Sequence, residues 1–204
     1  MPNWCNNNLT LTHEDPAMIQ RAFDALERGE FLQEFIPVPE QLKIVAGCVG
    51  DPVEQAKLEA DTARNLEELG YGNWYDFCVG EWGTKWDCGE QGASDIHPDG
   101  KMLHTFFDTA WAPPVAAYEK LVEMGFGVEA MYYEGGMGYA GSFGEHGDEE
   151  ISLEGLSADD VERDYPELDE CFGISECMRE YEEPEQLSEW LKDGVEQKKA
   201  LIAL

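Results

Sequence analysis

The chain has 204 residues, of which 44 are Asp or Glu and 13 are Lys or Arg, so its formal net charge at pH 7 is −31. Such a negative surface repels phosphate backbones and anionic lipid headgroups, which argues against direct binding to nucleic acid or to a membrane and favours a basic partner. A hydrophobic content of 43% indicates a folded protein rather than a disordered one. The sequence has neither a signal-like start nor an apolar run near the roughly 20 residues that cross a bilayer, so we expect a cytoplasmic protein.

The six cysteines are scattered along the chain, without a Cys-x-x-Cys pair and without clustered histidines. Structural zinc sites need closely spaced ligands, and secreted disulfide scaffolds are shorter and richer in cysteine. We therefore expect free thiols and neither a metal nor a cofactor. The pair Cys171 and Cys177, six residues apart in an acidic segment, leaves metal binding or oxidation open as an alternative.

The first half of the chain alternates strand and helix patterns. Residues 9–11 predict a first strand, and Asp15 followed by Pro16 predicts the start of an amphipathic helix that ends before Gly29. A second helix is predicted over residues 52–69. One face of this second helix carries Ala56, Ala60, Ala63 and Leu66.

Further strands are predicted at 102–109 and from 128, separated by a helix that opens after Pro114 and stops at Gly125. Residues 136–141 match the dinucleotide pattern G-x-G-x-x-G, but no helix follows to hold a pyrophosphate, so we interpret them as a hairpin turn. The order of elements predicts an α+β fold, namely a ferredoxin-like antiparallel sheet with helices on one face and a helical insertion at about 42–100.

The charge distribution divides the chain. Residues 145–204 carry 20 acidic and 5 basic residues, a net charge of −15 and about half of the total. This shift predicts a ferredoxin-like core over 1–147 and an acidic helical C-terminal section over 148–204 that packs on the core.

Two helices are predicted in the C-terminal section. Ser157 and Asp160 form a capping box with Asp in the place usually held by Glu, and residues 185–199 predict a second helix. The apolar face of this second helix carries Leu187, Trp190, Leu191 and Val195.

Four motifs together resemble the YubB ferredoxin-like family of bacteriophage and conjugative-plasmid proteins. They are Met-Pro-Asn-Trp-Cys-Asn-Asn-Asn-Leu at 1–9, Phe-Ile-Pro-Val-Pro-Glu at 35–40, Asn-Trp-Tyr-Asp-Phe at 73–77 leading to Trp-Gly-Thr-Lys-Trp-Asp at 82–87, and Phe-Asp-Thr-Ala-Trp-Ala-Pro-Pro at 107–114. The resemblance covers residues 1–147 and implies a ferredoxin-like fold and a mobile-element origin. The family has no established activity, so the resemblance supplies no catalytic residues.

The acidic section suggests a function. Carboxylates on consecutive helical turns approximate a row of phosphates, so the chain is predicted to be a DNA mimic rather than an enzyme. It would act through protein–protein interaction as an anti-defence or anti-CRISPR protein of a phage or plasmid. It would bind a basic, nucleic-acid-binding host protein, such as a restriction or CRISPR effector, and inhibit it. An acidic surface that serves only solubility is the alternative. The predicted partner-binding residues are Asp159, Asp160, Glu162, Asp164, Glu167, Asp169, Glu170, Glu176, Glu180, Glu182, Glu183 and Glu185.

An aromatic block gives a competing hypothesis, a small-ligand binder or enzyme. In this interpretation Lys85 and Asp87 meet a ligand between two indole rings. In a purely structural interpretation the tryptophans cover one face of the sheet, and Lys85 pairs with Asp87 at a turn. The residues of this alternative pocket are Trp82, Lys85, Trp86, Asp87 and His104.

Overall fold

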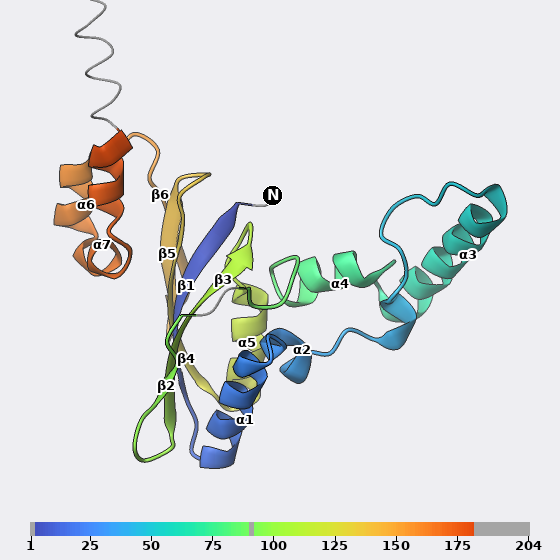
Figure 1. Ribbon diagram of the computed structural model, residues 1–204, viewed down its shortest axis with the longest axis horizontal. Coiled ribbons are helices and arrows are strands. Elements are labelled where there is room, and N and C mark those ends of the chain that lie inside the picture. The colour runs from blue at the N-terminus through green and yellow to red at the C-terminus, as the bar shows by residue number, and fades with distance from the viewer. Residues whose placement is uncertain (1–2, 90–91, 182–204) are drawn as a thin grey trace, which may run out of the picture. The chain divides into compact units, whose positions relative to one another are not determined.

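The computed structural model describes residues 3–89 and 92–181, and its internal contacts divide the chain into a first unit, Met1–Ser152, and a second unit, Leu153–Leu204. The first unit contains a six-stranded antiparallel sheet with helices, so the chain has an α+β fold as predicted (Figure 1). No helix within the described residues is long and apolar enough to span a membrane.

The sheet has the strand order β2-β3-β1-β4-β5-β6. The central strand β1 pairs antiparallel with both β3 and β4, so β3 and β4 run parallel to each other on either side of it. Helix α5 (Val115–Glu123) connects them. The strands are β1 (Trp4–Thr12), β2 (Asp95–Ile96), β3 (Met102–Ala110), β4 (Gly127–Glu134), β5 (Tyr139–Gly144) and β6 (Gly147–Ser152).

Residues 136–141 form the turn and the start of β5, as the hairpin interpretation predicted. The Glu134 carboxylate accepts hydrogen bonds from the backbone N–H groups of Gly136 (3.2 Å) and Met137 (2.5 Å), and Gly138 has φ +71°. No helix begins here, so the segment has no N-terminus that could hold a pyrophosphate.

Among the helices of the first unit, α1 (Pro16–Glu27) and α5 lie against one face of the sheet, whereas α3 (Pro52–Leu69) extends away from it (Figure 1). The Asp15 side chain caps the first helix as predicted, accepting from Ala17 N–H at 2.9 Å. Asp51 caps the helix that follows Pro52, and Gly70 ends it with φ +80°. The helices before β2 are α1 (Pro16–Glu27), α2 (Phe31–Phe35), the short 3-10 helix η1 (Glu40–Leu42), α3 (Pro52–Leu69) and α4 (Trp74–Glu81).

The core lies between the sheet and these helices. Alternate residues of β1 point into it, because successive side chains of a strand face opposite sides. Burying each large apolar side chain contributes about 1.5–3 kcal/mol. Fully buried members include Leu9, Leu11, Ile19, Leu26, Leu103, Phe107, Tyr118 and Leu121.

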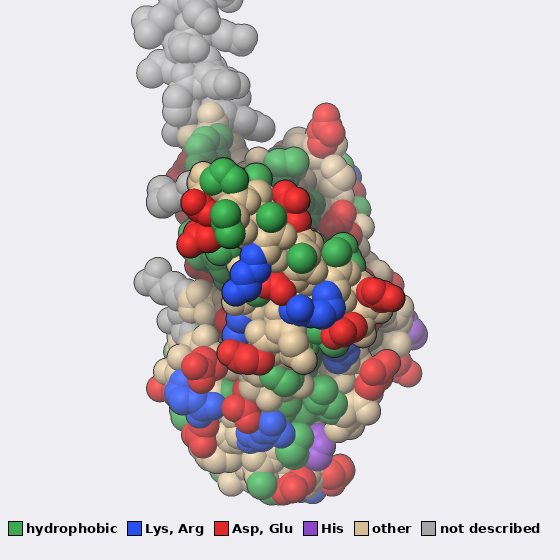
Figure 2. Space-filling view, turned by 90° about the vertical axis from the view of Figure 1, so that its right-hand side faces the viewer, with side chains coloured by type: hydrophobic (Ala, Val, Ile, Leu, Met, Phe, Trp, Pro, Cys, Tyr) green, Lys and Arg blue, Asp and Glu red, His purple; other side chains and the backbone are tan. Residues whose placement is uncertain are grey.

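Helix α3 differs from the pattern that its sequence indicates. Its alanine face, together with Leu66, is exposed, whereas Asn65 on another face is fully buried. Asn65 Nδ2 donates to Gln41 O (2.9 Å) and Gly72 O (3.4 Å), so a polar side chain attaches α3 to the segments before and after it. On the side of the molecule that α3 presents, Lys and Arg side chains lie among acidic and hydrophobic ones (Figure 2).

The sheet continues beyond the predicted boundary at residue 147. Strand β6 pairs with β5 from Gly147 to Ser152. The exposed residues Asp148, Glu149 and Glu150 belong to this edge strand rather than to the acidic helices. Charged side chains are typical of sheet edges, and therefore a boundary drawn from charge alone falls too early.

The second unit contains α6 (Ala158–Asp164) and α7 (Pro166–Phe172), and residues 174–181 are also helical. The predicted capping box is present: Ser157 Oγ accepts from Asp160 N–H, and the Asp160 carboxylate accepts from Ser157 N–H at 3.0 Å. The helix predicted over 185–199 lies outside the described residues. The buried apolar residues in the described part of this unit, 153–181, are Leu153, Ala158, Val161, Leu168 and Ile174.

Candidate functional site

The chain turns sharply after α4, and this turn positions the aromatic block. Gly83 has φ +85°, and a Cβ there would lie 3.2 Å from Pro113 O and from Val115 N. Only glycine fits such a left-handed, close approach without strain. Thr84 Oγ1 donates to Ala110 O at 2.9 Å. The next residues are thereby held beside the end of β3.

Three aromatic rings then surround one ammonium group, and a fourth ring lies beside one of them. Lys85 Nζ lies 4.5 Å from the ring centroid of Trp86, 4.8 Å from that of Trp111 and 5.9 Å from that of Tyr75. Trp4 lies 6.2 Å from Trp86. These five residues are called the aromatic surface below. Its three tryptophans are 39–42% exposed, a composition typical of protein-binding hot spots.

Trp111 holds a strained backbone conformation within this surface. Its φ of +73° is a positive value at a bulky residue. Two hydrogen bonds maintain it: Trp111 N–H donates to Asn3 O at 3.0 Å, and Tyr139 Oη donates to Trp111 O at 2.7 Å. Such strain costs on the order of 1 kcal/mol and is common at sites that position a side chain. Here it accompanies the contact of the indole with Lys85.

Trp82 belongs to the core rather than to the aromatic surface. It is 4% exposed, and its Nε1–H donates to Ile36 O at 2.9 Å. The buried indole attaches the end of α4 to the segment after α2. It therefore forms no wall of an accessible ligand site beside Lys85.

His104 lies at a different part of the sheet. Its Nε2 is 2.8 Å from Asn8 Oδ1, and its ring packs edge-on against Phe106. Trp111, a member of the aromatic surface, follows His104 by seven residues. Along an extended chain this is a separation of roughly 23 Å. The structure therefore does not bring the five residues of the predicted alternative pocket together.

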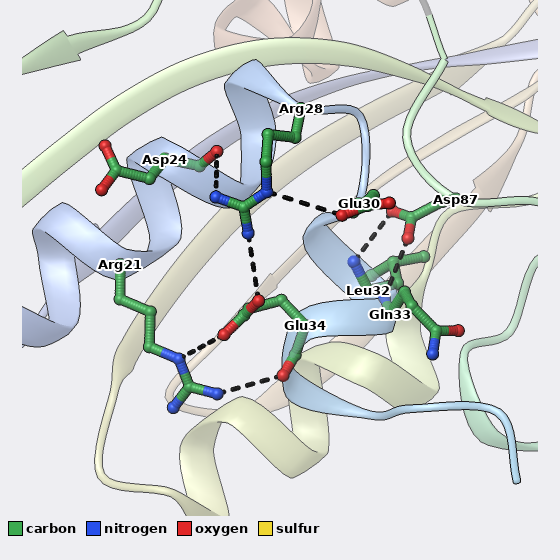
Figure 3. A network of polar contacts seen from close by, with 8 residues as sticks. All are labelled: Arg21, Asp24, Arg28, Glu30, Leu32, Gln33, Glu34 and Asp87. Carbon is green, nitrogen blue, oxygen red and sulfur yellow. Dashed lines mark hydrogen bonds and ion pairs between the residues drawn. The ribbon is translucent and has the colours of Figure 1, made fainter.

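Asp87 caps the N-terminus of α2 from a distant part of the sequence (Figure 3). Its Oδ1 accepts from Leu32 N–H and from Cys88 N–H, and its Oδ2 accepts from Gln33 N–H, each at 2.8 Å. Burial raises the pKa of the carboxyl group, and the three backbone N–H groups partly oppose this shift. Asp87 therefore fixes α2, and the expected pairing with Lys85 is absent because each residue has other partners.

Two arginines complete the junction between α1 and α2 (Figure 3). Arg21 Nε and Arg28 Nη2 contact the two carboxylate oxygens of Glu34 at 2.7 and 3.1 Å. Arg28 Nη1 also donates to Asp24 O at 3.0 Å. This network is structural, because Arg21 of α1 and Arg28 at its end both bind Glu34 of α2 and thereby join the two helices.

In the second unit, Arg163 neutralises two of the predicted partner-binding carboxylates. Its guanidinium lies 2.8 Å from Asp160 and 2.7 Å from Asp164. Hydrogen bonds from Ser157 and from Arg163 lower the pKa of Asp160 to about 2. Asp160 is thus committed to capping α6.

Arg179 holds two more carboxylates, on Asp159 and Glu162, each at 2.9 Å. Its guanidinium lowers the pKa of Glu162. Ser175 donates through its backbone N–H and its hydroxyl to Asp169, at 2.6 and 2.8 Å. These contacts connect α6 and α7 with the helical residues 174–181.

The other described carboxylates of the predicted set are exposed and form no ion pair with a described basic residue. They are Glu167, Glu170, Glu176 and Glu180. Three of these, Glu170, Glu176 and Glu180, line a shallow depression together with Glu162, Asp169 and Arg179. The remaining predicted residues, Glu182, Glu183 and Glu185, lie outside the described residues.

Three buried thiols have the properties of structural rather than reactive groups. Burial raises the pKa of Cys5 and of Cys78 to about 12, and it also raises the pKa of Cys88. Thiols of this kind remain protonated at neutral pH and are weak nucleophiles. Cys171 and Cys177 are half-buried, and the described residues contain no cluster of three or more metal-ligating side chains.

Sequence comparison gives no family for the chain: no family model matches it, and no curated protein matches it. One matching solved structure is the crystal structure of a protein api92 from Yersinia pseudotuberculosis, of the family DUF1281. The two chains are 11% identical, and the match covers 74% of this chain and 98% of that one with a TM-score of 0.38.

We predict that Asp87→Ala lowers the free energy of unfolding by about 2 kcal/mol, because it leaves buried N–H groups of α2 without an acceptor. Asp87→Asn retains one acceptor oxygen and should cost about half as much. Urea unfolding of the three proteins measures both effects. Equal stability of Asp87→Ala and the unaltered chain would contradict the assigned capping role.

We also predict that Lys85→Met lowers the free energy of unfolding by about 0.5–1 kcal/mol, since it keeps the aliphatic stem but removes the cation from three aromatic rings. Lys85→Arg retains the charge and serves as the matched control. Thermal unfolding followed by tryptophan emission tests this. A loss of the same size in Lys85→Arg would attribute the effect to packing instead of cation–π attraction.

Proposed function

We propose that this protein is a non-enzymatic interaction protein that binds a basic, nucleic-acid-binding partner by presenting carboxylates where nucleic acid presents phosphates. The observation that carries the proposal is the charge of the second unit. Residues 153–181 contain ten acidic residues and two arginines, a net charge of −8. Both arginines already pair with acids of the same unit.

The arrangement of the carboxylates supports this proposal. Glu176 and Glu180 are four residues apart in one helical segment, so their Cα atoms are about 6 Å apart along the axis. Neighbouring phosphates of one DNA strand are spaced about 3.4 Å along the duplex axis, so carboxylates from two or more helices would be needed to reach a comparable density. The ion pairs of Arg179 with Asp159 and Glu162 hold residues 174–181 against α6, and the hydrogen bonds from Ser175 to Asp169 hold them against α7.

We further propose that the first unit is a ferredoxin-like domain with an inserted helical segment and an added hairpin. The order β1-α1-β2-β3-α5-β4 and the sheet order β2-β3-β1-β4 support a pair of split βαβ units. In this assignment α2 to α4 are the insertion, and β5 and β6 are the addition. With the proposed mobile-element origin, the partner would be a host defence factor of the restriction or CRISPR type.

A small-ligand binder at the aromatic surface is the second candidate function. Three tryptophans that are 39–42% exposed favour it, two of them in contact with Lys85 and the third beside Trp86. Lys85 itself occupies the position between the rings, so a ligand would have to stack on their outer faces. Saturable quenching of tryptophan emission by a small molecule, abolished in Trp86→Ala, would support this candidate over the first.

The first proposal predicts that Glu170→Lys, Glu176→Lys and Glu180→Lys, combined in one chain, abolish partner binding. These residues are exposed and free of described ion pairs, so their reversal should leave the unit folded. The tagged protein would be used to capture partners from host lysate in salt steps, and duplex DNA would then be tested as a competitor for the captured protein. We expect release at moderate salt and displacement by DNA.

The matched control combines Glu27→Lys, Glu67→Lys and Glu68→Lys, which are exposed acids of α1 and α3. Both triple variants change the net charge by the same amount. If the control loses binding equally, net charge and not the acidic helices determines the interaction. If DNA does not displace the partner, the mimicry proposal is wrong.

A further inference from the structure

An apolar groove with an acidic rim crosses the edge of the sheet in the first unit. Its volume is about 620 Å³, within the range of ligand-binding clefts. Met102 of β3, Val122 of α5 and Phe126 supply apolar walls from both faces of the sheet. Met102 is 40% exposed and Val122 is 48% exposed, so apolar surface lies open to solvent. This groove is called the edge groove.

The groove exists because β5 is shorter than β4. The ladder between them begins at Ala130 and Phe143, and β5 ends at Gly144, where the β5–β6 hairpin closes. The residues Gly127–Glu129 of β4 therefore pair with β1 on one side and, within the described part of the sheet, with no strand on the other. Unpaired strand edges present backbone groups that can bind an added segment.

Gly127 and Gly144 both line the edge groove. A Cβ at Gly127 would collide with Thr12 Oγ1, so a side chain there would require the Thr12 hydroxyl to rotate away. At Gly144 a Cβ would meet nothing within 4 Å. The space beside Gly144 is therefore empty, although its backbone is not in the left-handed conformation that requires glycine.

The charged side chains that line the edge groove have one sign. Glu119, Glu129 and Glu145 line it and are exposed, and no Lys, Arg or His is among its lining residues. Carboxylates around an apolar floor complement a segment in which apolar side chains alternate with Lys or Arg. A second copy of the chain fits poorly, because each copy carries a net charge of −31.

We propose that the edge groove binds an extended basic segment of the partner protein. An apolar side chain of the segment enters the groove, its backbone lies along Gly127–Glu129, and its Lys or Arg residues face the three carboxylates. The inference rests on the proposed function, because it takes from it the basic character of the partner. It adds a second contact that recognises apolar side chains as well as charge.

The test uses a fluorescently labelled peptide of seven residues in which Lys or Arg alternates with Val or Ile, titrated by anisotropy. A second peptide replaces each Val or Ile by Ser and keeps the charge. We expect the apolar peptide to bind at least tenfold more tightly than the serine peptide. Equal affinity would mean that generic charge attraction alone operates, and it would overturn the proposal.

Gly144→Phe provides the variant that fills the groove, because strands accept aromatic side chains and the position is open. Gly50→Phe is the matched control, since a Cβ at Gly50 also meets nothing within 4 Å and the residue lies outside the groove. We expect Gly144→Phe to weaken binding of the apolar peptide at least tenfold and Gly50→Phe to change it less than twofold. Circular dichroism first establishes whether Gly144→Phe keeps the native fold. If it does, an unchanged affinity for the apolar peptide would overturn the proposal. If it does not, a variant with Glu119→Gln, Glu129→Gln and Glu145→Gln repeats the test.

Failure of this inference can be told apart from failure of the proposed function. If Gly144→Phe binds peptide and cellular partner normally while reversal of Glu170, Glu176 and Glu180 abolishes partner binding, the groove proposal fails and the mimicry proposal stands. If Gly144→Phe loses the peptide but DNA does not displace the partner, the groove proposal stands alone. If sedimentation shows a dimer that Gly144→Phe dissociates, the occupant is a second copy and the proposal is wrong.

Discussion

The antiparallel pairing of β1 with both β3 and β4 is the constraint on which the first unit depends. It places β3 and β4 in parallel, two strand positions apart, so that the chain between them must cross one face of the sheet as α5. Alternate side chains of β1 then contribute to the core beneath the helices, and the others lie on the opposite face. The two candidate surfaces of this unit occur at the two ends of the same strand. Trp4 begins β1 at the aromatic surface, and Thr12 ends it at the edge groove.

Local signals in the sequence were sufficient for the elements that are governed by local chemistry. Asp15 with Pro16, the helix over residues 52–69, and the capping box of Ser157 each depend on signals within a few residues, and each is present as predicted. The strand order, in contrast, depends on pairings between residues about a hundred positions apart. The sequence order of strands and helices was enough to predict an α+β fold. The extension of the sheet through β6 could be seen only in the structure.

The site was less predictable, for a related reason. Asp87 acts on α2 from 55 residues away, so no spacing rule connects them, and the adjacent Lys85 was the more obvious partner. The exposed alanine face of α3 misleads in the same way, because a periodic apolar pattern indicates a buried face, whereas a single buried asparagine makes the attachment. Trp4 and Trp111 come together only because Trp4 is paired with Ala110 at the end of β3. The sequence shows that these tryptophans exist, but it does not show that they are exposed or that they lie close together.

Several arginines of this acidic chain are already paired with acids of the same unit, so the excess carboxylates stay unneutralised. Arg21 and Arg28 share Glu34, Arg163 holds two aspartates, and Arg179 holds an aspartate and a glutamate, so these cations are used within the fold. Exposed pairs of this type stabilise little, but they position carboxylates and leave the excess acid unneutralised. A long-range field of this kind accelerates encounter with a basic protein but discriminates poorly among basic proteins. Selectivity then requires apolar contact, and the edge groove combines exposed apolar side chains with three carboxylates and a free strand edge.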